Sequence, residues 1–345
     1  MPVTGKKIAV LGAGAIGSSI AADLTQAGLD VTVIDQWPAH VEAMQAAGLR
    51  VTMTDNDVQT AVRALHLCDL ASTALEFDIV FLAVKSNDHR WMAEYIKPRL
   101  KPDGILVGTQ NGMNDDSIAE IIGRGRTLGC VVELQAELFT PGLIKRNTTR
   151  QGSWFSVGDL DGAYTPRVRE IETIMRNVGK VEVTNNIYGA KWTKLIANTM
   201  TMGPFGLLGL RNFEAAALPG MLDISLRLGK ESLAVGAALG YRMEPLFGLR
   251  ADEFAGSSDE NLVTTMETLM SHVGGGRTAP IHDHIKGRAS EIEFISGVVS
   301  RKGRELGIAT PLNDAVVEID RQINRGEIKM ERANFELLKK ASQAA

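Results

Sequence analysis

Short apolar, β-branched runs alternate with amphipathic segments through the first half of the chain. The runs predict strands, and the amphipathic segments predict helices. In chain order the expected elements are Lys7–Leu11, Ile16–Ala27, Val31–Asp35, Val41–Ala47, Ile79–Val84, Trp91–Leu100, Ile105–Gly108 and Ile118–Ile122. Strands joined by crossover helices pair in parallel, with helices on both faces of the sheet. We therefore expect a doubly wound α/β sheet.

The periodicity changes close to residue 184. The first half ends with two strand-like runs, a helix and a last strand, at Leu128–Leu134, Trp154–Val157, Pro166–Val178 and Lys180–Val183. From Tyr188 onward apolar residues recur every three or four positions, as in Trp192, Leu195 and Ile196, in Met221, Ile224 and Leu228, and in Ile292, Ile295 and Val299. This spacing is typical of helices. We expect a sheet domain over residues 1–184 and an all-helical domain over residues 185–345.

The composition narrows the class of protein. A length of 345 residues fits two domains better than one. A net charge of -4, without a basic stripe, argues against nucleic acid as a partner. No apolar run reaches the roughly 18 residues of a membrane span, and the start does not resemble a signal peptide, so we expect a cytoplasmic protein that binds no membrane. Cys68 and Cys130 are too few for a disulfide framework.

A glycine-rich motif follows the first predicted strand directly. Gly12-Ala13-Gly14-Ala15-Ile16-Gly17 matches G-x-G-x-x-G between a strand and a helix. Glycines there permit a tight turn, a close approach of a pyrophosphate and close packing of the helix, whose first N–H groups face the phosphates. Asp35 ends the second strand, at about the ~20-residue distance where an acid binds the ribose 2′-hydroxyl. This context predicts a Rossmann-type, dinucleotide-binding domain.

Asp35 also bears on the choice of cofactor. A carboxylate accepts a hydrogen bond from a free 2′-hydroxyl but repels the 2′-phosphate of NADP, so the sequence predicts NAD. Two alternatives leave NADP open. Asp35 could instead cap the following turn, or a cation such as Arg50 could offset its charge.

Further motifs make the chain resemble the ketopantoate reductase (2-dehydropantoate 2-reductase) family over about residues 6–322. They are Leu82–Lys85, Gln110–Met113, Trp192–Asn198, Asp283–Ile292 and Gly307–Pro311. The resemblance implies a Rossmann domain followed by a helical substrate and catalytic domain, with the active site between them.

Four of these motif residues can be interpreted without the family. Ligands of open α/β sheets bind beyond the carboxyl ends of the strands, where Lys85 and Asn111 follow two strands. Lys194 and Asn198 are four residues apart and share a helix face. Hydride transfer to a carbonyl places negative charge on its oxygen, so the site needs a proton donor or a cation. We therefore expect Lys194 to be the general acid.

The resemblance implies a role for each position. Lys194 matches the family's catalytic lysine, and Glu291 matches a glutamate that is both catalytic and substrate-binding. Asn198 and Asn111 would hold a substrate oxygen and the cofactor ribose or amide, and Lys85 would face cofactor and substrate. Structural alternatives remain for four of these positions: an exposed lysine at positions 194 and 85, a helix-end charge at 291 and a core amide at 198.

No metal site is predicted. His282, Asp283 and His284 invite a metal, but a spacing of two residues places the histidines on different helix faces, and no third ligand is evident. The long helical faces of the second domain allow a homodimer.

Two departures from the family bear on the substrate. Met202-Gly203-Pro204 stands where the family has a second asparagine, and Ala279-Pro280 stands where it has a serine, with Thr278 the nearest hydroxyl. Loss of these polar anchors favours a larger or less polar pocket. Residues 245–280 are interpreted as a surface excursion or lid, or as a loop without a role.

The sequence thus predicts an NAD(P)-dependent oxidoreductase that interconverts a 2-oxo acid or ketone with its hydroxy form, prefers NAD and works as a dehydrogenase. Two alternatives remain. One is ketopantoate reductase proper, with NADPH, and the other is a dinucleotide-binding regulatory protein that has lost its chemistry.

Overall fold

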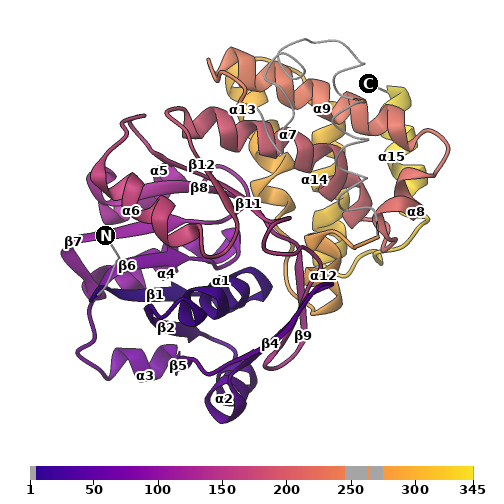
Figure 1. Ribbon diagram of the computed structural model, residues 1–345. Helices are drawn as coiled ribbons and strands as arrows, with labels where there is room; N and C mark the ends of the chain where they lie inside the picture. Colours follow the sequence, from indigo (N-terminus) through magenta and orange to yellow (C-terminus); the bar gives the residue numbers. More distant parts are fainter. Residues whose placement is uncertain (1–4, 245–262, 264–274, 345) are drawn as a thin grey trace. The chain divides into compact units, whose positions relative to one another are not determined.

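Eight strands form one sheet, in the order β12-β11-β8-β7-β6-β1-β2-β5, in the computed structural model of the chain (Figure 1). Their bounds are β1 (Lys7–Leu11), β2 (Asp30–Asp35), β5 (Arg63–His66), β6 (Phe77–Leu82), β7 (Leu100–Gly108), β8 (Thr127–Glu133), β11 (Trp154–Asp159) and β12 (Lys180–Val183). From β5 to β8 neighbouring strands are parallel, whereas β11 runs antiparallel to β8.

Helices cover both faces of this sheet. They are α1 (Ala15–Gln26), α2 (Pro38–Ala47), α3 (Leu67–Ala71), α4 (His89–Ile96), α5 (Asp115–Ile122) and α6 (Pro166–Met175), with one-turn helices η1 (Ser86–Asp88), η2 (Lys97–Arg99) and η3 (Arg124–Arg126). The period of two in β1 explains the layers. Ile8 and Val10 belong to the core beside α1 and α6, while Ala9 and Leu11 belong to the core beside α4 and α5. The expected doubly wound sheet is confirmed.

A second, four-stranded sheet was not predicted. Its order is β4-β3-β10-β9, with bounds β3 (Leu49–Thr52), β4 (Asp57–Thr60), β9 (Ala136–Thr140) and β10 (Leu143–Arg146). Helix α1 packs on both sheets. All eight residues from 17 to 24 are therefore buried, rather than one stripe of the helix.

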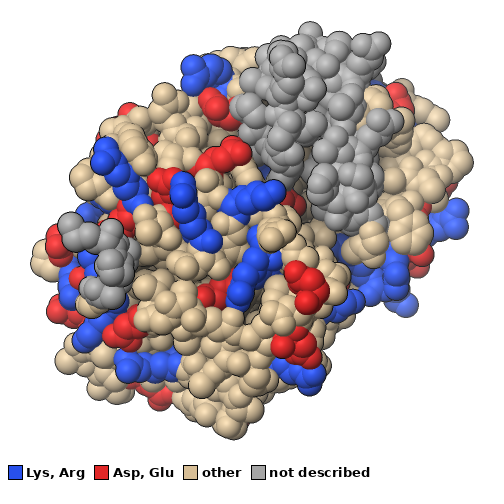
Figure 2. All heavy atoms as spheres, in the orientation of Figure 1, with Lys and Arg blue, Asp and Glu red and all other residues tan. Residues whose placement is uncertain are grey.

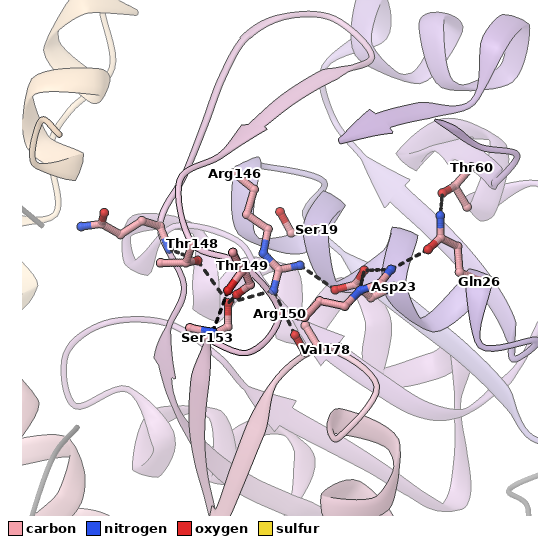
Figure 3. A network of polar contacts seen from close by, with 12 residues as sticks. Ser19, Asp23, Gln26, Thr60, Arg146, Thr148, Thr149, Arg150, Ser153 and Val178 are labelled. Atoms are coloured by element: carbon pink, nitrogen blue, oxygen red, sulfur yellow. Dashed lines mark hydrogen bonds and ion pairs between the residues drawn. The ribbon is translucent and has the colours of Figure 1, made fainter. Parts of the chain in front are cut away.

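A buried ion pair joins α1 to the small sheet (Figure 3). Asp23 Oδ2 lies 2.6 Å from Nη1 of Arg146, whose side chain is 0% exposed. Arg146 also donates to Ser153 Oγ at 2.8 Å and to the Val178 carbonyl at 2.9 Å. Arg150 donates through Nε to Asp23 Oδ1 at 2.7 Å. The carboxylate of Asp23 thus contacts two guanidinium groups, of which Arg146 is buried and Arg150 is partly exposed.

The chain divides into two compact units. The sheet unit comprises Met1–Gln110 and Asn114–Ile187, and the helical unit comprises Asn111–Met113 and Tyr188–Ala345. Residues 5–244, 263 and 275–344 are described by the structure. Most of the predicted excursion at 245–280 lies outside the described residues. Within the described part of the chain, no helix is both long and apolar enough to span a membrane.

The helical unit has its own apolar core. Its helices are α7 (Ile187–Gly206), α8 (Asn212–Ala216), α9 (Met221–Ala238), α12 (Ala279–Ile285), α13 (Ser296–Leu306), α14 (Pro311–Asn324) and α15 (Asn334–Ala344), with the one-turn helix η4 (Ile292–Phe294). The expectation that Ile292, Ile295 and Val299 share one helix is wrong. Ile295, with φ -114° and ψ -91°, separates η4 from α13.

Charged side chains are interspersed on the molecular face that Figure 2 shows. Basic and acidic groups alternate over the described surface there, and no continuous basic stripe is visible on it. The described part of the chain contains exposed ion pairs, such as Arg50 with Asp57 and Arg90 with Glu120. Pairs of this kind contribute little to stability because water screens them.

Breaking the buried ion pair between Asp23 and Arg146 should lower the stability of the protein far more than breaking an exposed ion pair. We expect Asp23→Asn to lower the free energy of unfolding by about 3–5 kcal/mol, because it leaves Arg146 charged and buried. The measurement is urea denaturation followed by tryptophan fluorescence. Asp57→Asn, which breaks the exposed pair with Arg50, is the matched control and should leave the transition nearly in place. Equal effects of the two substitutions would contradict this account of α1.

Candidate active site

The glycine-rich turn is shaped by contacts that exclude side chains. Gly12 has φ +97°, and a Cβ there would lie 2.7 Å from Val84 N. A Cβ on Gly17 would lie 1.9 Å from the Gly12 carbonyl oxygen. Gly12 N donates to the Ile34 carbonyl at 2.8 Å, which ties the turn to β2. Two of the three motif glycines are thus required by the turn itself.

The third glycine faces open space. Gly14 is exposed, and a Cβ there would meet nothing within 4 Å. It is the N-cap of α1, which has no capping side chain and no acidic residue in its first turn. Among the residues that the structure describes, no side chain caps the first N–H groups of α1. Uncapped N–H groups beside a glycine fit the pyrophosphate of a dinucleotide.

Asp35 lies against the same turn. Its Oδ2 accepts a hydrogen bond from Ala13 N at 2.6 Å, and its Oδ1 accepts one from Trp37 N at 2.8 Å. Asp35 therefore caps the following turn, as the alternative proposed, through its hydrogen bond with Trp37 N. Its second oxygen also contacts the glycine loop, through Ala13 N. Each oxygen keeps capacity for a further donor. The suggestion that Arg50 offsets this charge is wrong, because Arg50 pairs with Asp57 at 2.6 Å.

Lys85 follows β6 on the edge of the sheet that carries the glycine loop. Ala83 N donates to the Leu11 carbonyl at 2.8 Å, and Val84 lies against Gly12. Lys85 has an extended backbone, is half-buried and precedes η1. Asn114 Nδ2 donates to Ser86 Oγ at 3.0 Å and so holds the start of η1. The predicted cofactor residues that belong to the sheet unit thus lie on one edge of the main sheet. Asn111 is not among them, because it belongs to the helical unit.

Asn111 belongs to the helical unit. Its Oδ1 accepts a hydrogen bond from Asn198 Nδ2 at 3.3 Å. The next residue, Gly112, has φ +85°, and a Cβ there would lie 2.5 Å from the Phe294 carbonyl oxygen. Phe294 N donates to the Glu291 carbonyl at 2.8 Å. The asparagine-glycine turn therefore contacts both α7 and the turn that carries Glu291.

Helix α7 is oriented by its tryptophan. Trp192 Nε1 donates to the Ser232 carbonyl on α9 at 2.9 Å, and a Cβ on Gly236 would lie only 2.0 Å from that nitrogen. The side of α7 that carries Trp192 therefore packs against α9. Further along the same helix, Lys194 is half-buried and Asn198 is 4% exposed. The exposed-lysine alternative for Lys194 is wrong.

Glu291 is 3% exposed, so the alternative of an exposed helix-end charge is wrong as well. It lies directly before η4, while Lys194 lies one turn before Asn198 on α7. Within the helical unit the structure thus joins Asn111 to Asn198 directly, and joins Asn111 to the turn of Glu291 through Gly112.

Two further side chains near the site escaped prediction. Lys191 is 3% exposed and lies one helical turn before Lys194. His40 Nε2 lies 3.2 Å from Ser18 Oγ, which donates to the Ala13 carbonyl in the glycine loop at 2.9 Å. His40 comes 22 residues after Ser18. A lysine three positions before Lys194 is a usable sequence signal, whereas nothing local to His40 indicates this contact.

One histidine of the His282-Asp283-His284 segment contacts an aspartate on α14. His284 Nε2 lies 3.0 Å from Asp320 Oδ1, and both side chains are buried. Asp283 is also buried. In the part of the chain that the structure describes, no three His, Cys, Asp or Glu side chains form a candidate metal-binding group.

A glycine loop between the first strand of an α/β sheet and the following helix is typical of dinucleotide-binding proteins. Here the sheet unit is joined to a helical unit that contains Lys194, Asn198 and Asn111. Ketopantoate reductase PanE/ApbA matches residues 8–162, and Ketopantoate reductase PanE/ApbA C terminal matches residues 186–324. The chain belongs to the ketopantoate reductase family, oxidoreductases that act on CH–OH groups with NAD(P).

Known proteins resemble the chain over most of its length. The 2-dehydropantoate 2-reductase of Mesorhizobium japonicum is 29% identical over 341 residues, covering 92% of this chain and 97% of the relative. A PanE/ApbA family ketopantoate reductase from Ralstonia eutropha JMP134 superposes with a TM-score of 0.79 at 25% identity, covering 93% and 99%. The structure of D-mandelate dehydrogenase with NADH and anilino(oxo)acetate superposes with a TM-score of 0.82 at 21% identity. The match covers 93% of this chain and 99% of the dehydrogenase.

The glycines offer a test that separates folding from cofactor binding. Gly14→Ala adds a methyl to open space, so we expect an unchanged unfolding temperature and a loss of NADH affinity of about tenfold or more. Gly17→Ala forces a methyl against the Gly12 carbonyl and should destabilise the protein itself by about 1–3 kcal/mol. Thermal unfolding and NADH fluorescence titration measure the two effects. Unchanged NADH affinity in folded Gly14→Ala would exclude the glycine loop as the binding site.

Proposed function

We propose that the chain interconverts a 2-oxo acid and the corresponding 2-hydroxy acid with NAD as the preferred cofactor. The contact between Asn198 and Asn111 carries this proposal. It joins two amides 87 residues apart in the chain, one turn from Lys194 and beside the turn of Glu291. A lysine and two amides together supply the donors that a carbonyl and a carboxylate require.

Each residue has a defined task in the proposed reaction. When bound, the nicotinamide supplies a hydride to the carbonyl carbon, or accepts one in the oxidative direction. Lys194 donates a proton to the carbonyl oxygen, so that C=O, hydride and proton give CH–OH. Asn198 and Asn111 hold substrate and cofactor oxygens. Glu291 accepts a hydrogen bond from the substrate or orients Lys194. Lys85 faces the cofactor from the sheet unit.

The preference for NAD rests on Asp35. Its carboxylate is held against the glycine loop by Ala13 N, at the end of β2. A ribose 2′-hydroxyl can donate to this group, whereas a 2′-phosphate would be repelled. The structurally similar D-mandelate dehydrogenase binds NADH, which is compatible with this preference.

We expect NADH to bind more tightly than NADPH by about tenfold or more, and Asp35→Ala to reduce that ratio towards one. The measurement is a titration with each dinucleotide, following nicotinamide fluorescence. Asp57→Ala removes an exposed carboxylate elsewhere in the sheet unit and should leave the ratio unchanged. Tighter binding of NADPH by the unsubstituted protein would reject the preference and return NADPH-dependent ketopantoate reduction to first place.

A less polar substrate than ketopantoate is proposed. Met202 and Pro204 occupy the last turn of α7, where a second asparagine was expected from the family. Thr278, the hydroxyl nearest to the family's serine position, is 6% exposed, and its Oγ1 is buried without a hydrogen-bond partner among the described residues. A panel of ketopantoate, phenylglyoxylate and aliphatic 2-oxo acids ranks the candidates by kcat/KM.

Ketopantoate reductase proper is the second candidate, because that is the name of the Mesorhizobium relative. Highest kcat/KM for ketopantoate with NADPH would establish it. Tight NADH binding with no turnover across the panel, in both directions, would favour a regulatory protein instead.

Lys194→Ala should lower kcat by about 10²–10⁴, the usual contribution of a general acid, because the developing oxyanion loses its proton donor. NADH affinity should change little. Steady-state kinetics with the best substrate of the panel measure the first effect, and fluorescence titration measures the second. Lys302→Ala, on the exposed side of α13, is the control. An unchanged kcat would remove Lys194 from the reaction.

A further inference from the structure

The turn before Glu291 is attached to a fully buried carboxylate. Asp320, on α14, is 0% exposed. Ser290 Oγ lies 2.8 Å from each of its two carboxylate oxygens. His284 Nε2 lies 3.0 Å from Oδ1, and Asn324 Nδ2 donates to Oδ2 at 2.8 Å. Because a carboxylate only accepts, His284 carries its proton on Nε2 and Ser290 donates its hydroxyl proton.

Ser290 and Ile292 together fix both sides of Glu291. Ile292 N donates to Ser290 Oγ at 3.2 Å while the same hydroxyl donates to Asp320. The backbone preceding and following Glu291 is therefore tied to one hydroxyl, and that hydroxyl is tied to Asp320. Phe294 N closes the turn on the Glu291 carbonyl at 2.8 Å.

The cluster contains serine, histidine and aspartate but lacks the geometry of a catalytic triad. In a triad the histidine lies between the serine and the acid. Here Asp320 lies in the middle and accepts from both Ser290 and His284. Such an arrangement cannot activate the serine as a nucleophile, because the hydroxyl proton points to an acceptor that is already hydrogen-bonded. It is suited to holding its donors in place.

We propose that Asp320 is a positioning residue for Glu291, acting through Ser290. This inference rests on the catalytic or substrate-binding role of Glu291 in the proposed function. A carboxylate buried with several donors is costly to desolvate, and it orients those donors closely once they are in place. Displacing a reacting group by about 1 Å can cost as much as 10²-fold in rate, so loss of Asp320 should act on kcat.

The first test does not depend on a substrate. Asp320→Ala should speed amide hydrogen exchange in a peptide that covers residues 288–296 by about tenfold or more, because the hydroxyl that accepts from Ile292 N loses its anchor. Asp320→Asn retains one acceptor oxygen and serves if the alanine variant does not fold. Glu318→Gln, an exposed change on the same helix, is the control. Unchanged exchange in both Asp320 variants would overturn the inference.

The second test is a double-mutant cycle on kcat, with the best substrate of the 2-oxo acid panel. Asp320→Ala alone should lower kcat by about tenfold to hundredfold, and NADH affinity should not change. In a Glu291→Gln background it should have little further effect, because the residue that it positions is already disabled. An equal loss in both backgrounds would show a general structural role and overturn the inference.

Two outcomes separate this inference from the proposed function. If Glu291→Gln alone leaves kcat unchanged, the proposed role of Glu291 fails, whatever Asp320 does. If Glu291→Gln lowers kcat and Asp320→Ala does not, only the positioning role fails. Ser290→Thr keeps the hydroxyl and should retain most of kcat, whereas Ser290→Ala should reproduce the loss seen with Asp320→Ala. Equal kcat in the two Ser290 variants would contradict the link through the hydroxyl.

Discussion

The position of α1 between two sheets is the constraint on which the sheet unit depends. The eight residues from 17 to 24 are all buried, which is possible because both sheets pack on the helix. Burying Asp23 at this place requires a cation, and Arg146 of the small sheet supplies it. At the other end of the helix, Ser18 and His40 connect the glycine loop to Gly142, whose N–H donates to His40 Nδ1. The small sheet thus holds the helix that follows the glycine-rich turn.

Helix α9 plays the corresponding part in the helical unit. Its Ser232 carbonyl accepts a hydrogen bond from Trp192 of α7, and this contact fixes the orientation of the helix that carries Lys194. It also supplies Glu231, whose carboxylate accepts hydrogen bonds from two backbone N–H groups at the start of α14. Burial raises the pKa of Glu231 above its usual value, although these bonds favour the charged form. Because α14 carries Asp320, α9 contacts both the helix that bears Lys194 and the helix that bears the proposed positioning residue.

Local patterns were enough for the main sheet and the glycine loop, because each depends on residues close in sequence. The small sheet was missed because its strands are four or five residues long and β3 pairs with β10 from a distant part of the chain. Asp320 was missed for a similar reason, since its partners Ser290 and His284 are 30 and 36 residues away. Pairings of this kind are set by tertiary structure and leave no periodic signal.

The two hydrogen bonds of Asp35 connect the residue on which the proposed NAD preference rests to the backbone of the glycine loop. Both donors are backbone N–H groups, from Ala13 and Trp37, so the carboxylate is oriented before any ribose arrives. Removing the acid to admit a 2′-phosphate would also leave Ala13 N without its acceptor. Adaptation to NADP therefore requires a replacement that still accepts from Ala13 and a cation for the phosphate. Neutralising Asp35 alone supplies neither, so we expect its loss to relax the proposed preference for NAD without creating a preference for NADP.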